Sequence, residues 1–214
     1  MDYSKKLFKY TKDFFKDFLD DKRINAIFLG GSGSRNIADK YSDIEVFIIW
    51  DVETTKETRT SIFNTTNYEI LVDEEFESPA EWTTSLLIDD IKFDIYHWEE
   101  PLIDYFYEEI YTKLSASSSV QCSISSMLDA KTIKGEEYIN FLKAKFSNYP
   151  KELAEKIIKK KSFYERWGVR YVLLEREDLL ALENMMNGYL IQALKVIFAL
   201  NKVYLRRTNF KWLD

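Results

Sequence analysis

Two short apolar runs on either side of a glycine-rich loop constrain the fold more than any other part of the sequence. The runs are INAIFL at residues 24–29 and IEVFIIW at residues 44–50, and their length and β-branched residues predict two strands. The loop between them begins with GGSGS, which holds three of the six glycines of the chain. We therefore expect a sheet near the N-terminus, with a tight turn directly after its first strand.

Neither of the two common glycine motifs for phosphate binding fits this loop. Gly31 and Gly33 are followed by Asn36 where a dinucleotide fingerprint needs a third glycine, and no Gly-Lys-Ser/Thr ends the run. A turn of small residues can still bring backbone N–H groups and a hydroxyl against phosphate oxygens. Gly31 and Ser32 are the candidates for that role, and a plain tight turn is the alternative.

Three acids in or beside apolar strands are candidates for a metal site. Asp43 and Glu45 are two residues apart, so in a strand both carboxylates point to one face, with Cα atoms about 6.6 Å apart. Burying both without a cation would cost several kcal/mol, and Mg²⁺ prefers oxygen ligands. In IKFDIYHW at residues 91–98, alternation places Asp94 and His97 on opposite faces. Asp94 is therefore the third candidate and His97 is left out, while solvated edge-strand acids remain the alternative.

The remainder of the first half predicts further strands. An amphipathic helix is expected over residues 7–19, and the polar segment 52–66 is a helix candidate. Residues 68–72 read as a third strand. WTTSLLI and IKFDIYHW flank Asp89 and Asp90 as a hairpin, although the usual Asn-Gly or Asp-Gly turn is missing. This totals about five strands by residue 98.

The second half has helical patterns. Residues 101–114, 135–147, 151–166 and 168–205 are expected to be helical, the last too long to be uninterrupted, and the Ser-rich stretch SASSSVQCSISS to break the pattern. We predict an α+β protein with two domains. Residues 1–115 form a mixed sheet of about five strands with flanking helices, and residues 116–214 form a C-terminal helical bundle.

Composition excludes several classes of protein. The formal net charge of −6 disfavours nucleic acid as a partner, because binding the phosphate backbone needs a basic face. The single cysteine, Cys122, excludes an internal disulfide and a cysteine-cluster metal site, which favours a reducing compartment. The N-terminal residues lack the apolar stretch of a signal peptide, and no window has the ~18 apolar residues of a membrane span. We therefore expect a cytoplasmic protein without a membrane partner.

The order Gly31-Ser32, spacer, Asp43-x-Glu45 and a later strand with Asp94 resembles the DNA polymerase β type nucleotidyltransferase superfamily. Within it, the chain is most similar to small bacterial antibiotic nucleotidyltransferases of the lincosamide and aminoglycoside kind and to their uncharacterised relatives. Glu45 stands where a second aspartate is commoner. The segment IFALNKVYLRRTNFKWLD resembles the helical domain of those relatives, in which Lys-Trp follows an Ala-Leu-Asn-Arg/Lys run and the domain often continues beyond the position of Asp214.

The resemblance implies transfer of a nucleoside monophosphate, most simply AMP from ATP or another nucleoside triphosphate, to a hydroxyl of a small molecule such as an antibiotic. Two Mg²⁺ ions would be held by Asp43, Glu45 and Asp94, which would be the catalytic residues. Asp94 would also help to deprotonate the acceptor hydroxyl. Gly31, Ser32 and Lys211, which matches the Lys-Trp of the relatives, would bind the triphosphate.

Two other functions stay open from the sequence. One is a nucleotidyltransferase of the toxin–antitoxin type that modifies a protein or tRNA, although the acidity weighs against tRNA. The other is a nucleotide-binding scaffold without catalysis. A homodimer is compatible with all three.

Overall fold

The computed structural model describes residues 2–63, 68–75, 79–159 and 167–206. The chain divides into two compact units, Met1–Glu108 with Ser126–Ser147, and Glu109–Ser125 with Asn148–Asp214. The division predicted from the sequence, at residues 115 and 116, differs because Ser126–Ser147 belongs to the sheet-bearing unit. This segment contributes a strand that pairs with the first strand of the sheet.

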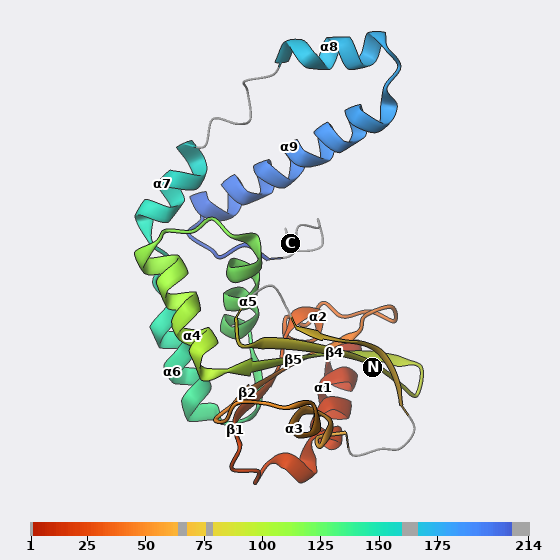
Figure 1. Ribbon diagram of the computed structural model, residues 1–214, viewed down its shortest axis with the longest axis vertical. Helices are drawn as coiled ribbons and strands as arrows, with labels where there is room; N and C mark the ends of the chain where they lie inside the picture. Colours follow the sequence, from red (N-terminus) through yellow and green to blue (C-terminus); the bar gives the residue numbers. More distant parts are fainter. Residues whose placement is uncertain (1, 64–67, 76–78, 160–166, 207–214) are drawn as a thin grey trace. The chain divides into compact units, whose positions relative to one another are not determined.

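The described part of the first unit is built on a six-stranded mixed sheet (Figure 1). Its order is β3-β4-β5-β2-β1-β6; β2 and β5 are parallel, and the other neighbours are antiparallel. The strands are β1 (Ile24–Leu29), β2 (Ile44–Trp50), β3 (Glu69–Glu75), β4 (Glu81–Ile88), β5 (Ile91–Glu99) and β6 (Lys131–Lys134). The predicted count of about five missed β6. This strand is short and carries two lysines, as sheet edges commonly do, and so lacks an apolar signal.

The hairpin predicted around Asp89 and Asp90 is confirmed. β4 and β5 pair from Ile88 opposite Ile91, which leaves a two-residue loop. Asp89 and Asp90 have φ values of 49° and 61°. A type I′ turn requires positive φ at both of these positions. Aspartate enters this region more readily than most residues, so the Asp-Asp pair takes the place of Asn-Gly.

Both faces of the central strands are buried. On one face, Ile27, Val46 and Ile95 belong to a core cluster with Leu7 of α1 (Tyr3–Phe14) and Phe15. On the other face, aromatic rings stack against one another.

The aromatic face of the sheet is covered by a helix. Phe28 and Phe47 stack at a ring-centroid distance of 4.8 Å, and Trp98 meets Phe106 of α4 (Glu100–Tyr107) edge-on at 5.4 Å. Burial on both faces explains why β1 and β2 read as continuous apolar runs rather than as alternating ones.

The remaining elements of the first unit are short. They are η1 (Lys16–Phe18), α2 (Gly31–Ser34), α3 (Lys56–Thr60) and α6 (Glu136–Phe146). Of the predicted helix 52–66, α3 is the described helical part. The predicted helix 135–147 corresponds to α6.

The second unit is helical in its described part. Its elements are η2 (Glu108–Thr112), α5 (Ser118–Leu128), α7 (Lys151–Lys159), α8 (Trp167–Glu175) and α9 (Leu179–Leu200). The unit boundary falls inside α5. The expectation that the Ser-rich stretch breaks the helices was wrong for all but its first three residues, since α5 begins at Ser118. The predicted interruption of the last helix lies at Glu177, whose φ is 52°, and Asp178, which accepts from the Ala181 N–H and caps α9.

In the part of the chain that the structure describes, no helix combines the length and the apolar character needed to cross a lipid bilayer.

Candidate functional site

Two carboxylates from neighbouring parallel strands lie side by side on the sheet. Glu45 of β2 is the register partner of Asp94 of β5, and paired residues of adjacent strands project to the same face. Two residues further along each strand, the rings of Phe47 and Tyr96 stack with their centroids 4.6 Å apart. This contact confirms that Glu45 and Asp94 lie on the same face of the sheet, since residues two apart in a strand share a face. Glu45 is 8% exposed and Asp94 is 6% exposed. The register thus brings together two of the three acids singled out from the sequence.

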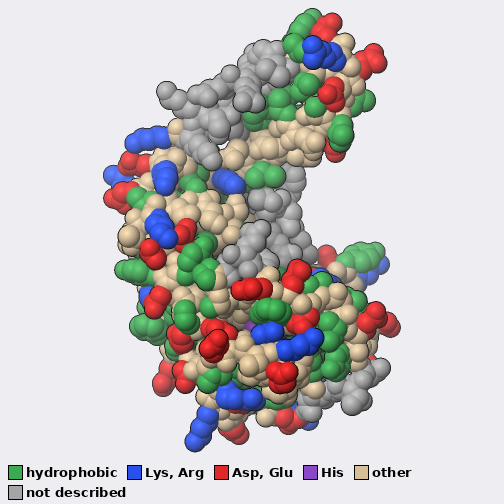
Figure 2. Space-filling view, viewed as in Figure 1, with side chains coloured by type: hydrophobic (Ala, Val, Ile, Leu, Met, Phe, Trp, Pro, Cys, Tyr) green, Lys and Arg blue, Asp and Glu red, His purple; other side chains and the backbone are tan. Residues whose placement is uncertain are grey.

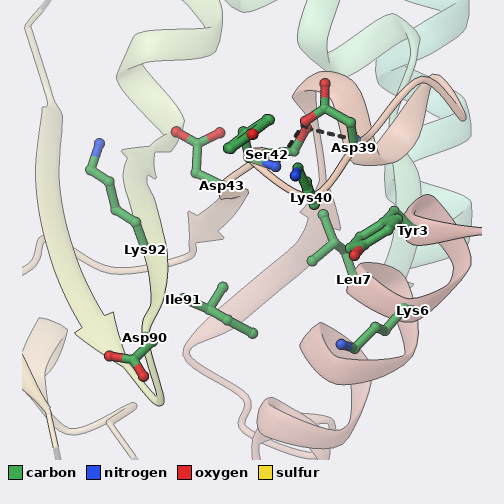
Figure 3. A pocket seen from close by; sticks show the side chains of 11 residues that line it. Tyr3, Lys6, Leu7, Asp39, Lys40, Ser42, Asp43, Asp90, Ile91 and Lys92 are labelled. Carbon is green, nitrogen blue, oxygen red and sulfur yellow. Dashed lines mark hydrogen bonds between the residues drawn. The ribbon is translucent and has the colours of Figure 1, made fainter.

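The third acid, Asp43, lies one residue before β2. It is half-buried and lines a cavity of about 500 Å³ together with Asp90 and Lys92 of the hairpin. In Figure 3, Asp43 lies between Lys92 and Ser42 at the rim of this cavity. The volume is within the range of small-ligand pockets.

His97 faces away from the carboxylates, as strand alternation predicts. Trp50 Nε1 donates to His97 Nδ1 at 3.2 Å, and His97 Nε2 lies 3.3 Å from Thr84 Oγ1. The indole nitrogen can only donate, so Nδ1 accepts and the ring is neutral with its proton on Nε2. Burial, and secondarily the charge of Arg59, lowers the pKa of His97 to about 3. His97 is therefore a neutral core residue.

The glycine turn packs directly against Glu45. The Gly30 N–H donates to the backbone oxygen of Glu45 at 2.9 Å, which joins the turn to β2. Gly31 has a φ of +57°, and a Cβ built on it would lie 1.6 Å from Glu45 Oε2. Only glycine meets both conditions, because other residues are strained at this φ and carry the Cβ that the carboxylate excludes. The turn and the carboxylates therefore form one site.

The helical turn α2 is tied down by its own hydroxyl and by a lysine. Ser34 Oγ donates to the Gly31 carbonyl at 3.0 Å. Lys131 of β6 donates to the Gly33 carbonyl at 2.9 Å and to Asn36 Oδ1 at 2.6 Å, and burial lowers the pKa of its ammonium group. Ser32, the proposed phosphate ligand, is half-buried at the second position of α2. The sequence did not single out Lys131, because it lies in β6, a four-residue edge strand that has no recognisable apolar pattern.

Arg35 follows the turn and forms an ion pair. Its Nε lies 2.5 Å from Asp129 Oδ2, and its side chain is only 9% exposed. This interaction anchors the end of the turn to the segment that precedes β6. Arg35 thus differs from a solvated loop arginine.

Asp94 accepts hydrogen bonds on both carboxylate oxygens. Ser85 Oγ of β4 donates to Oδ1 at 2.5 Å, and Lys92 Nζ donates to Oδ2 at 2.8 Å. Lys92 is 45% exposed along its side chain, while that of Asp94 is 8% exposed. The ammonium group neutralises a carboxylate that burial would otherwise destabilise. Alternation already placed Lys92 on the face of Asp94, but the sequence did not assign it a role.

The carboxylate oxygens of this site suit a hard divalent cation, provided that the Lys92 ammonium group gives way at Asp94. Glu45 and Asp94 supply neighbouring buried carboxylates, and Asp43 is two residues from Glu45. However, no group of three or more His, Cys, Asp or Glu side chains among the described residues is arranged to hold a metal ion. Lys92 and Ser85 occupy the oxygens of Asp94 instead. An ion bound at Oδ2 of Asp94 would compete with the Lys92 ammonium group.

The predicted triphosphate ligand Lys211 lies outside the described residues.

Comparison with known proteins does not assign the chain to a family. No family model matches it, and neither does any curated protein. It is similar to the crystal structure of a nucleotidyltransferase-like protein from Exiguobacterium sibiricum, with a TM-score of 0.41 and 8% identity. That similarity covers 96% of this chain and 60% of the other, so this chain spans less than two thirds of that protein. A similarity at this level carries no argument about function.

Proposed function

We propose that the protein transfers a nucleoside monophosphate from a nucleoside triphosphate, most simply ATP, to a hydroxyl of a small molecule in a magnesium-dependent reaction. The observation that carries the proposal is the pairing of Glu45 with Asp94 beside a turn whose Gly31 packs against the Glu45 carboxylate. Such a turn can present N–H groups to phosphate oxygens, next to carboxylates that suit Mg²⁺. A packed core requires neither feature.

The chain's own residues would divide the work as follows. The Gly31 N–H and the Ser32 hydroxyl would bind phosphate oxygens, while Asp43, Glu45 and Asp94 would hold divalent cations. Bound Mg²⁺ would neutralise charge on the phosphates during an in-line displacement. The acceptor oxygen forms a bond to the α-phosphorus, and the bond from that phosphorus to the bridging oxygen of pyrophosphate breaks. The hydroxyl proton passes to a carboxylate, for which Asp94 is the candidate.

Lys92 adds a condition to this proposal. Its ammonium group lies where a cation bound to Asp94 would be, 2.8 Å from Oδ2. The side chain is half-exposed and flexible, so it can swing out into the cavity that it lines. We expect Mg²⁺ to compete with Lys92 for Asp94, and the displaced ammonium group to be available to an anionic substrate.

The cavity beside Asp43 suggests where the acceptor binds. Its size suits a small molecule rather than a macromolecular surface. Lysine and aspartate side chains alternate around it, with Lys6 and Lys40 as well as Asp39 and Asp90 in the lining. A hydroxylated acceptor that also carries charged groups, as many antibiotics do, would match this lining.

The test is a transfer assay with α-labelled nucleoside triphosphates, Mg²⁺ and a panel of hydroxylated acceptors that includes lincosamides and aminoglycosides. We expect pyrophosphate release and label in a small-molecule product. Asp43→Asn should abolish both, whereas Asp13→Asn, a change of the same type on the exposed side of α1, should leave them unchanged. Persistent turnover in Asp43→Asn would refute the assignment. Label in protein or RNA from a lysate would instead favour a macromolecular acceptor.

A nucleotide-binding protein without transfer activity is the second candidate. The Lys92–Asp94 ion pair favours it, because a permanent ammonium group would replace one metal ion. Calorimetry separates the two candidates. Nucleotide binding that is unaffected by Mg²⁺ would support the second candidate, and binding that requires Mg²⁺ would support the transferase.

A further inference from the structure

Helix α9 carries an apolar stripe with the spacing of a coiled coil. The stripe runs the length of this 22-residue helix in alternating steps of four and three residues. We call it the α9 seam; its residues are Leu179, Glu183, Met186, Leu190, Ala193, Ile197 and Leu200. The mean step of 3.5 residues is the period at which two helices can stay in contact while they supercoil.

The seam is exposed, although most of its residues are hydrophobic. Leu179 is 70% exposed, Met186 56%, Leu190 47%, Ile197 44% and Leu200 64%. In Figure 2, hydrophobic side chains are visible on the surface of α8 and the adjoining part of α9, at the top of the view. Contiguous exposed apolar surface of this kind usually marks an interaction site.

The interior contacts of α9 use other faces of the helix. Leu194, Phe198 and Ala199 are its buried residues, and α9 packs on α7 and α8. At 100° per residue, the mean direction of these three side chains around the helix axis differs from that of the seam by more than a quarter-turn. Packing among the described residues of the second unit therefore does not account for the apolar residues of the seam.

A second copy of the same helix is the occupant that this pattern suits best. A heptad seam is filled by the knobs of another heptad seam, and α9 of a second chain has the same period over the same length. A helix of 22 residues is about 33 Å long, and covering half of a cylinder about 10 Å wide buries roughly 500 Å² per helix. The total of roughly 1,000 Å² is at the lower end of specific interfaces, which implies a dimer that dissociates on dilution.

Glu183 determines whether the two α9 helices pair in a parallel or an antiparallel orientation. In a parallel pair, it would face Glu183 of the partner subunit within an apolar seam, and the two carboxylates would repel each other. In an antiparallel pair, the two-fold axis passes near Leu190, and Leu179 faces Leu200 of the partner subunit. The two Glu183 carboxylates then lie far apart, each beside Ile197 of the partner subunit. A single polar residue in a seam commonly specifies register in this way.

We propose that α9 is a dimerisation helix that pairs antiparallel with α9 of a second copy of this chain. The pairing uses the exposed seam and is centred on Leu190. It involves neither the carboxylates nor the glycine turn, so it does not depend on the proposed function.

Sedimentation velocity across roughly a hundredfold range of protein concentration tests the dimer. We expect a monomer–dimer equilibrium. Leu190→Glu places two carboxylates against each other on the two-fold axis and should weaken the dimer at least about 100-fold. Asn184→Glu adds the same charge at an exposed position of α9 outside the seam and should leave the dimer intact. A wild-type chain that stays monomeric throughout, or a Leu190→Glu dimer of unchanged affinity, would overturn the proposal.

Disulfide trapping tests the orientation. In a Cys122→Ser background, which removes the one native thiol, Leu190→Cys should form a cross-linked dimer on mild oxidation. Leu179→Cys should not, because its counterpart lies at the other end of the helix pair and disulfides need Cα atoms within about 7 Å. Cross-linking of both variants would establish a parallel pair and contradict the antiparallel model. Cross-linking of neither would contradict α9 pairing altogether.

Discussion

Replacing Gly31 with alanine is the sharpest test of how the turn and the carboxylates are joined. The added methyl carbon would lie 1.6 Å from Glu45 Oε2. Non-bonded heavy atoms rest roughly 3.5 Å apart, so the turn or the Glu45 side chain must move by about 2 Å. Gly31 is buried in α2 and Glu45 lies on β2, whose residues are all buried, which leaves little room for that movement.

The expected cost has two parts. An alanine held at a φ of +57° costs about 1–2 kcal/mol relative to glycine. Overpacking at a close-packed position adds about 1–3 kcal/mol. We expect Gly31→Ala to lower the free energy of unfolding by about 2–5 kcal/mol. Under the proposed function, displacement of Glu45 should also reduce turnover about 100-fold.

The assay is urea unfolding followed by circular dichroism, with Gly188→Ala as the control. Gly188 lies inside α9, and a Cβ there meets no atom within 4 Å, so alanine should stabilise its helix by about 0.5–1 kcal/mol. Glu45→Ala and the double variant complete a mutant cycle. The cycle should yield a coupling energy of about 1–3 kcal/mol, because Glu45→Ala removes the clash but not the backbone strain. Additive changes, or an unaltered stability of Gly31→Ala, would refute the close packing.

Three further predictions address other parts of the first unit. The pKa of His97, about 3 when folded, lies below its ordinary value of 6.5. The unfolded chain therefore binds more protons between these values, and the free energy of unfolding should fall by up to about 1.4 kcal/mol per unit as pH drops through this window. In pH-dependent denaturation His97→Gln should flatten this slope, and an unchanged slope would contradict the burial argument. Lys92→Met should tighten Mg²⁺ binding about tenfold or more in calorimetry, because no ammonium group competes for Asp94; weaker binding would show that Lys92 supports the ion instead. Asp90→Gly should stabilise the hairpin by about 0.5 kcal/mol or more in thermal unfolding, since glycine adopts a φ of 61° without strain; destabilisation would contradict the assigned turn.

Local patterns predicted what depends on local geometry. The β4–β5 hairpin follows from two apolar runs that are close together in the sequence. The separation of His97 from Asp94 follows from strand alternation, which is a property of one strand by itself. The break between α8 and α9 was foreseen from length alone. β6 was missed because four residues with two lysines carry no periodic signal, and α5 because serine-rich sequence resembles a loop.

The interactions around the site could not be predicted in the same way. Lys131 reaches the glycine turn from β6, and Arg35 pairs with Asp129, across about a hundred residues of chain in each case. Whether a lysine or arginine pairs with a particular carbonyl or carboxylate depends on which segments the fold brings together. Sequence separation gives no information about this.

The sequence by itself determined which residues are chemically suited to a site: a turn that tolerates only small residues, and acids embedded in apolar strands where their charge is costly. Only the tertiary structure decided that Glu45 stands beside Asp94, that Gly31 is held against Glu45, and that Lys92 occupies Asp94. The reason is that side-chain direction is set within a strand, whereas register and neighbours are set by the packing of the whole sheet.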